Sequence, residues 1–141
     1  DGDAKEQGPT DQVYGTAPPK VRWRRYEVES YLVHPAVLER FVEQRVGSGA
    51  ASAAHRADLK RHFEQQYPPA FLRDPLADLP MLVATKARTE LLGNAFVAAG
   101  LPNLDYRDFH EIAALMQPDE IHPEVRLKLD QIHATLAGAA P

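Results

Sequence analysis

Apolar residues return every three or four positions over most of this chain, which is the period of an amphipathic α-helix. Proline, glycine and short polar residues interrupt the period at several points and divide the chain into five expected helices. The first follows His34-Pro35 and closes at Gly47, the second spans 52–67, the third lies within 81–99, the fourth begins at Asp105, and the fifth begins at His122-Pro123.

The first 28 residues have a different pattern. Residues 1–19 are rich in glycine, proline and aspartate and lack an apolar period, which predicts a loop-rich segment. Residues 20–28 alternate Val21 and Trp23 with arginines, as a short strand with one buried face would. We therefore divide the chain into a loop-rich segment, 1–19, and a short strand followed by a helical domain, 20–141.

These elements predict a mainly α fold: a compact domain of about five helices with a minor extended segment. Short connections between the helices indicate that neighbouring helices pack side by side. On the fifth helix, Val125, Leu129, Ile132 and Leu136 are expected to face inward. The large apolar residues expected in the core are Trp23, Leu38, Phe41, Phe63, Leu92, Phe96, Phe109, Ile112, Leu129 and Ile132.

The composition is that of a globular protein and excludes several kinds of site. At 141 residues, 44% hydrophobic and 26% charged, the chain has the size and composition of one globular domain. Sixteen basic against 20 acidic residues give a net charge of −4, so a nucleic-acid contact would need a local basic patch. The absence of cysteine excludes disulfides and thiolate metal sites. It also suits a reducing cytoplasm. No apolar run approaches the ~20 residues of a membrane span, so we expect a soluble protein without membrane contact.

Charged and aromatic residues are concentrated in the sequence "RWRRYEVESYL", which begins at Arg22 and precedes "HPAVL". Together with "DGDA" at residues 1–4, this run resembles the C-terminal region of ATPases that carry a Toprim-type nuclease domain, the overcoming-lysogenization-defect-like group. In that group an Asp-x-Asp motif follows a strand, and a later run similar to this one, with asparagine more often in place of Ser30, leads into helices. The segments "YRDFHEIAALM" and "DEIHPEVRLKLDQI" also look like the helical tail of such chains.

The resemblance implies a metal-dependent DNA endonuclease of the phage-defence or DNA-repair type. It implies Mg²⁺ or Mn²⁺ held by Asp1 and Asp3, because hard cations prefer carboxylate oxygens. ATP would enter only through a domain absent from this chain, which begins at Asp1 without a methionine and is expected to be a piece of a longer protein, inactive alone. The catalytic candidates are Glu27, Glu29 and Lys86, and the DNA-binding candidates are Arg22, Trp23, Arg24 and Arg25.

Each candidate also has a simpler structural interpretation. Aspartates beside glycine often form turns, and Glu27 and Glu29 beside three arginines can form a surface salt-bridge network. The arginine run can be a solvated strand face whose tryptophan belongs to the core, and Lys86 can be an ordinary exposed lysine. None of the six histidines forms an i, i+4 pair that would predict a helical zinc site.

The alternative function is a non-catalytic helical domain that binds a partner protein or forms a homo-oligomer. The sequence does not decide whether Glu27 and Glu29 lie on a strand, where they would point the same way, or on a helix, where they would diverge. Whether the chain belongs to an enzyme therefore stays open at this point.

Overall fold

A computed structural model describes residues 23–102 and 105–139 of the chain. Within these ranges there are seven α-helices and no strand, so the predicted mainly α fold is confirmed. The α-helices are α1 (Pro35–Val46), α2 (Ala53–Gln66), α3 (Pro69–Arg73), α4 (Pro80–Ala84), α5 (Leu92–Ala98), α6 (Tyr106–Ala114) and α7 (Pro123–Ala139). Short helical turns of different pitch are η2 (Val28–Leu32), η3 (Gly49–Ala51), η4 (Ala87–Leu91) and η5 (Pro118–Glu120).

The helix boundaries follow from local signals in the sequence. Helix α1 has Pro35 in its first turn, where the missing N–H needs no partner, and it ends at Gly47, whose φ of 120° suits a residue without a Cβ. Helix α6 begins after Asp105, whose carboxylate accepts hydrogen bonds from the N–H groups of Arg107 and Asp108. These are the caps that the polar and apolar pattern predicts.

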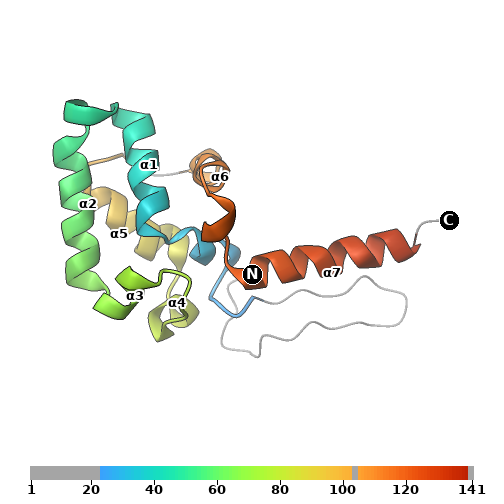
Figure 1. The fold of residues 1–141 in the computed structure, drawn as a ribbon. Helices are drawn as coiled ribbons and strands as arrows, with labels where there is room; N and C mark the ends of the chain where they lie inside the picture. The colour runs from blue at the N-terminus through green and yellow to red at the C-terminus, as the bar shows by residue number, and fades with distance from the viewer. Residues whose placement is uncertain (1–22, 103–104, 140–141) are drawn as a thin grey trace.

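Helices α1 and α2 lie side by side, α5 packs against α2, and α6 covers another side of α1 (Figure 1). The core lies between these helices and includes an edge-to-face pair, Phe41 and Phe96, whose ring centroids are 5.3 Å apart. Of the residues that the sequence placed in the core, Leu38, Phe41, Phe63, Leu92, Phe96 and Ile112 are buried. Three others, Trp23, Phe109 and Ile132, are half-buried.

The segment before α1 differs from the prediction. In the described part of the expected strand, residues 23–28, the chain bends and then enters η2. Only one backbone bond there reaches a distant segment, from the Tyr26 N–H to the Leu82 carbonyl, at 2.9 Å. The strand prediction is wrong for these residues, because their backbone forms no ladder with a neighbouring strand and the buried Arg25 side chain donates its hydrogen bonds to carbonyl oxygens of Ser30, Leu76 and Ala77.

The region expected to contain the third helix holds two. Helix α4 ends at Ala84, an extended step passes through Lys86, and η4 continues directly into α5. The pattern does not predict helix α3, because Pro68-Pro69 ends the second expected helix at residue 67, whereas Pro69 also occupies the first turn of the next helix.

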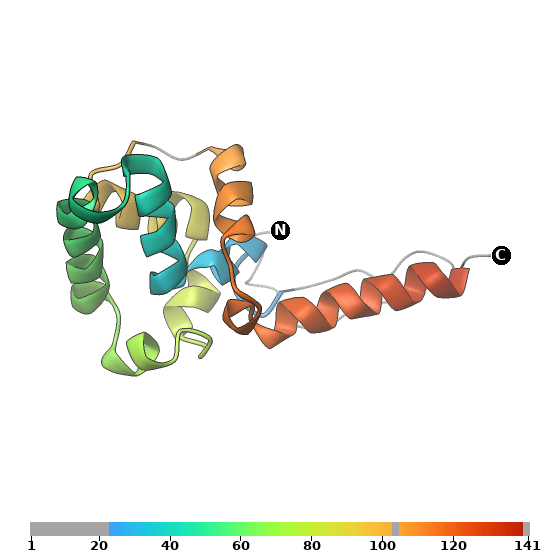
Figure 2. The ribbon, with the colours of Figure 1, turned by 45° about the horizontal axis from the view of Figure 1, so that its top comes forward.

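Helix α7 extends away from the other helices (Figures 1 and 2). Its inward face was predicted to contain Leu129 and Leu136, and this prediction is wrong: Leu129 is 56% exposed and Leu136 is 65% exposed. An amphipathic stripe shows that a helix has an apolar face but not that the rest of the chain covers it. No helix within the described ranges is long and apolar enough to cross a bilayer.

Candidate functional site

Two of the predicted catalytic residues, Glu27 and Glu29, meet the segment that contains the third, Lys86, at the start of η4. The Glu27 carboxylate accepts hydrogen bonds from the Ala87 N–H at 2.9 Å and from the Arg88 N–H at 3.4 Å. The Arg88 Nε lies 3.7 Å from Glu27 Oε2 and 3.9 Å from Glu29 Oε1. We call Glu27, Glu29 and Arg88, together with Lys86, which is the residue just before η4, the η4 cluster.

Local structure explains why the η4 cluster forms. The first N–H groups of a helix have no partner within the helix and carry a partial positive charge, so a carboxylate is stabilised there. Glu27 is the last extended residue before η2 and is only 5% exposed. It supplies the carboxylate for the start of η4, which belongs to a different part of the chain.

The other members of the cluster are open to solvent. Glu29 lies in η2, keeps about a quarter of its side chain exposed, and reaches Arg88 only at 3.9 Å. Lys86 is exposed, and half of the Arg88 side chain is exposed. Glu27 and Glu29 therefore both face Arg88, although the backbone is extended at Glu27 and helical at Glu29. The buried glutamate holds the backbone, while Glu29 and Lys86 remain available to a ligand.

Arg25, predicted to contact DNA, is buried instead, with 2% of its surface exposed. Its Nε lies 3.3 Å from Asp78, and its terminal nitrogens donate to the carbonyl oxygens of Ser30, Leu76 and Ala77. Burial lowers the pKa of Arg25, and the nearby Asp78 carboxylate opposes this shift. With these bonds made, Arg25 joins the loop before α4 to the segment before α1.

Tyr31 connects the same region to the base of α7. Its ring lies 4.9 Å from the Arg25 guanidinium, and its hydroxyl donates a short hydrogen bond to Glu124 in the first turn of α7. Burial, and then this bond to Glu124, raise the pKa of Tyr31 far above its usual range. Glu124 also accepts from the Arg24 N–H at 2.8 Å. The base of α7 is therefore anchored by polar contacts.

His122 completes this anchor. Its Nδ1 accepts from the Glu124 N–H at 2.9 Å, and its Nε2 lies 3.4 Å from Asp78 Oδ1. These contacts fit a neutral imidazole with the proton on Nε2. Burial and then the Arg25 charge lower the pKa of His122, whereas Asp78 opposes the shift. We call Arg25, Tyr31, Asp78, His122 and Glu124 the anchor network.

The remaining DNA-binding candidates lie at the edge of the anchor network. Trp23 is half-buried, with its ring centroid 5.5 Å from that of Tyr31. The Arg24 side chain is 54% exposed and reaches Asp78 at 3.5 Å. Arg24 is thus the arginine of this run that the structure places toward solvent, while Arg22 lies outside the described residues.

The predicted metal ligands, Asp1 and Asp3, also lie outside the described residues. Within residues 23–102 and 105–139, no three His, Asp or Glu side chains are grouped so that they could hold a metal ion. Among the described residues, Glu29 could add one carboxylate to a metal site. A divalent ion would therefore need ligands beyond those that the structure describes.

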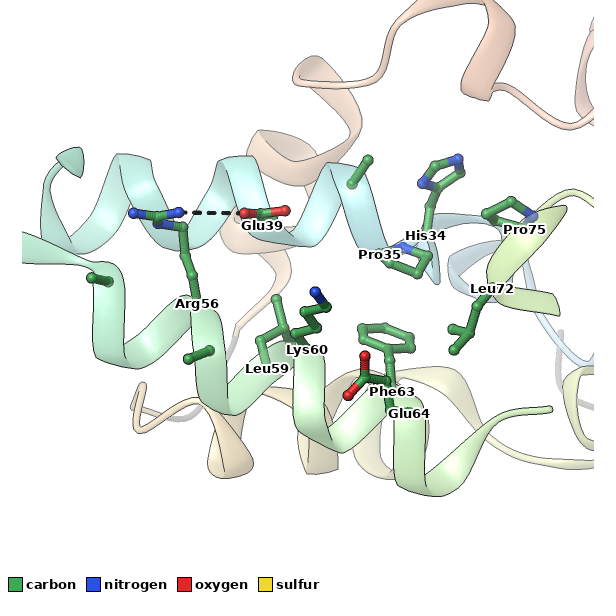
Figure 3. Close-up of a pocket in the computed structure, with 13 residues that line it drawn as sticks. His34, Pro35, Glu39, Arg56, Leu59, Lys60, Phe63, Glu64, Leu72 and Pro75 are labelled. Carbon is green, nitrogen blue, oxygen red and sulfur yellow. Dashed lines mark hydrogen bonds and ion pairs between the residues drawn. The ribbon is translucent and has the colours of Figure 1, made fainter. Parts of the chain in front are cut away.

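A groove of about 730 Å³ between α1 and α2 lies apart from the η4 cluster and contains none of the predicted site residues (Figure 3). Its walls are largely apolar, with Leu59, Phe63 and Leu72 among the lining side chains. Glu39 lies on this groove and is paired with Arg56 at 3.5 Å. The groove provides side chains of matched type, none of them a member of the η4 cluster, for control experiments.

Sequence reasoning missed Asp78 and Arg88 as partners of the predicted residues. Asp78 follows a proline-containing loop and resembles an ordinary turn residue, so no signal pointed to Arg25. Arg88 had a usable signal, since it lies two positions after Lys86 at a helix start, but that helix start was itself not predicted. A comparison with protein-family models, with curated proteins and with solved structures found no match to this chain.

Proposed function

We propose that this chain is the C-terminal part of a Toprim-like, ATPase-coupled, metal-dependent DNA endonuclease of the phage-defence or DNA-repair type, acting in the cytoplasm. The observation that carries the proposal is the η4 cluster: two glutamates of the "RYEVES" run meet the segment of Lys86, about 60 residues later in the chain. Those are the residues for which the sequence resemblance implied a catalytic role.

In this proposal the residues of the η4 cluster have separate tasks. Glu27 is a positioning residue, because its carboxylate is committed to the N–H groups of Ala87 and Arg88. Glu29 keeps about a quarter of its side chain exposed, and its carboxylate can support a metal ligand or orient a water molecule. Lys86 can place a positive charge beside a phosphate oxygen, and Arg24, at the edge of the anchor network, can contact the DNA backbone.

Asp1 and Asp3 would hold Mg²⁺ or Mn²⁺, since paired carboxylates suit hard divalent cations. When bound, such an ion polarises a phosphoryl oxygen and lowers the pKa of a water molecule. The ATPase would be supplied by another part of the parent protein. The 141-residue chain alone is therefore expected not to cleave DNA, and metal-dependent nicking by it, abolished by a chelator, would contradict this proposal.

The test is made in the longer parent protein with Glu29→Gln and Lys86→Met. Lys86 is exposed, and Glu29 keeps about a quarter of its side chain in solvent and contacts Arg88 only at 3.9 Å, so the variants should fold normally while the cleavage rate falls about 10- to 100-fold. The matched controls are Glu39→Gln and Lys60→Met, which lie on the groove between α1 and α2. Cleavage by both site variants at the rate of the controls would remove the η4 cluster from the mechanism.

The metal assignment has its own test. Asp1→Asn and Asp3→Asn should weaken Mn²⁺ binding, measured by titration calorimetry without substrate. If both variants bind Mn²⁺ and cleave DNA like the unmodified parent, the Toprim assignment is wrong, whatever the result at Glu29 and Lys86.

A further inference from the structure

The start of α7 is capped by a side chain that can take up a proton. His122 is only 7% exposed, and its Nδ1 accepts a hydrogen bond from the Glu124 N–H at 2.9 Å. Because Pro123 has no N–H, the Glu124 N–H is the first backbone donor of the helix. A neutral imidazole accepts this bond with one ring nitrogen, whereas an imidazolium carries protons on both nitrogens and cannot accept it.

Titratable side chains from several elements face this imidazole. Asp78, in the loop before α4, lies 3.4 Å from Nε2, and the ring centroid of Tyr31 in η2 is 5.2 Å from that of His122. Arg25 adds a positive charge from the segment before η2, and Glu124 adds a negative charge from α7 itself. The Arg25 Nε already lies 3.3 Å from the same Asp78 oxygen. Burial and then the Arg25 charge outweigh both carboxylates and lower the pKa of His122, which favours the neutral form in the folded protein.

Helix α7 is attached to the other helices at its base. Within the described ranges, the apolar core contains no residue of α7, and the helix extends away from the other helices (Figures 1 and 2). The contacts at the base are polar: Glu124 accepts from the Tyr31 hydroxyl and from the Arg24 N–H, and Lys128 is buried one turn further along. Loss of these contacts would therefore leave the core between α1, α2 and α5 in place.

We propose that His122 is a pH-dependent switch: the neutral imidazole caps α7 and keeps its base docked against Tyr31 and Arg25, and protonation releases the base while the helical core stays folded. This proposal does not rest on the nuclease function.

The direction of the pH dependence follows from the two states of the imidazole. In the released state His122 is in water and has the ordinary pKa of about 6.5. In the docked state its pKa is lower, so the released state binds more protons between that lowered pKa and about 6.5. Docking of α7 has its full strength above this window and weakens by at most about tenfold for each pH unit within it.

The single tryptophan of the chain, Trp23, can report the release. Its ring centroid is 5.5 Å from that of Tyr31, and the N–H of the next residue, Arg24, donates to Glu124. We expect the fluorescence of the 141-residue chain to shift to longer wavelength on acidification from pH 7 to pH 5, with a midpoint below about 6.5. Most of the helical circular dichroism should remain through this transition, because the core is not involved.

Variants at His122 assign the transition to this side chain. His122→Asn keeps a capping oxygen that does not titrate, so α7 should stay docked and the transition should disappear. His122→Ala has no capping group and should show the long-wavelength emission already at pH 7. The matched control is His34→Asn, because His34 is also buried before a proline at a helix start, and this variant should keep the transition.

Amide hydrogen exchange gives a second readout that does not depend on Trp23. The N–H groups of Val125 and Arg126 donate to the His122 carbonyl, and their protection factors should fall on acidification while those of α1 do not. An unmodified transition in both His122 variants, or its loss in His34→Asn, would overturn the assignment to His122. A transition that coincides with loss of the helical circular dichroism, or no change in either readout between pH 7 and pH 5, would overturn the local release of α7.

Discussion

In the segment from Trp23 to Leu32 charged side chains are buried, whereas in helix α7 apolar side chains are exposed. The first segment is densely charged, yet Arg25 and Glu27 are the most buried charged residues in the part of the chain that the structure describes. Helix α7 has a regular apolar stripe, yet its leucines are more than half exposed. The difference arises because Arg25 and Glu27 find backbone groups that need a partner, whereas the described helices do not cover most of the stripe on α7.

This contrast shows how a polar run can organise a small helical fold. Arg25 donates to three carbonyl oxygens, and Glu27 accepts from two N–H groups, so both satisfy backbone groups that elements of secondary structure leave unpaired. Burying either charge without these partners would cost several kcal/mol. Their removal should therefore harm the fold more than removal of any exposed leucine.

The largest effect is expected at Arg25. Arg25→Met should lower the free energy of unfolding by about 3 kcal/mol, the lower end for breaking a buried ion pair, because Asp78 keeps about a third of its side chain in water. Arg24→Met is the control and should cost less than about 1 kcal/mol, since Arg24 is half exposed. Urea unfolding measures the free energy of unfolding of both variants. Equal losses would show that the buried contacts of Arg25 do not stabilise the fold more than the exposed contacts of Arg24.

Glu27 should give the next largest effect. Glu27→Ala leaves the Ala87 N–H without its acceptor and should lower the free energy of unfolding by about 1 to 3 kcal/mol. Glu29→Ala, which loses only a contact at 3.9 Å, should cost less than about 1 kcal/mol. The same denaturant titrations apply, and a Glu29→Ala loss as large as that of Glu27→Ala would contradict the positioning role of Glu27.

Protonation of buried histidines should lower the stability of the fold as the pH falls. Burial lowers the pKa of His34, His62 and His122 below the ordinary value. Between that lowered pKa and about 6.5, the unfolded chain binds more protons than the folded chain, so stability should fall as the pH drops below about 6.5. Thermal unfolding between pH 7 and pH 5 measures this, and a melting temperature that rises on acidification would contradict the neutral, buried state of these imidazoles.

A second acid transition should follow at lower pH. Burial alone would raise the pKa of Asp108, but hydrogen bonds from the Asp105 N–H and from Arg45 outweigh it and lower that pKa. Stability from this carboxylate is present above its unfolded pKa and is lost as the pH falls through the lowered value. Asp108→Asn should therefore reduce the loss of stability below about pH 4, and an unchanged acid profile would argue against this ion pair.

The smallest effect is expected on α7. Leu136→Ala should change the free energy of unfolding by less than about 0.5 kcal/mol at low protein concentration, because the side chain is already 65% exposed. A buried leucine such as Leu38 should cost about 2 to 5 kcal/mol when replaced by alanine. A similar loss at both positions would show that α7 is covered in solution.

The sequence predicted the positions of the helices better than the burial and the partners of their side chains. Proline in the first turn, Gly47 and the Asp105 cap located α1 and α6 because these signals act within a few residues. The burial of Arg25 could not be predicted, because most of its hydrogen-bond partners, Leu76, Ala77 and Asp78, lie about 50 residues away in a loop without a distinctive pattern. The η4 cluster was partly predicted: both glutamates and Lys86 were named, but Arg88 and the helix start that joins them were not.

The central claim is that the charged segment is fixed in the fold while the outer part of α7 is open. Amide hydrogen exchange of the 141-residue chain at low concentration compares both regions in one experiment. We expect the Ala87 and Arg88 amides, which Glu27 holds, to exchange orders of magnitude more slowly than the amides of residues 130–137. Equal protection of the two regions in the monomer would contradict this account.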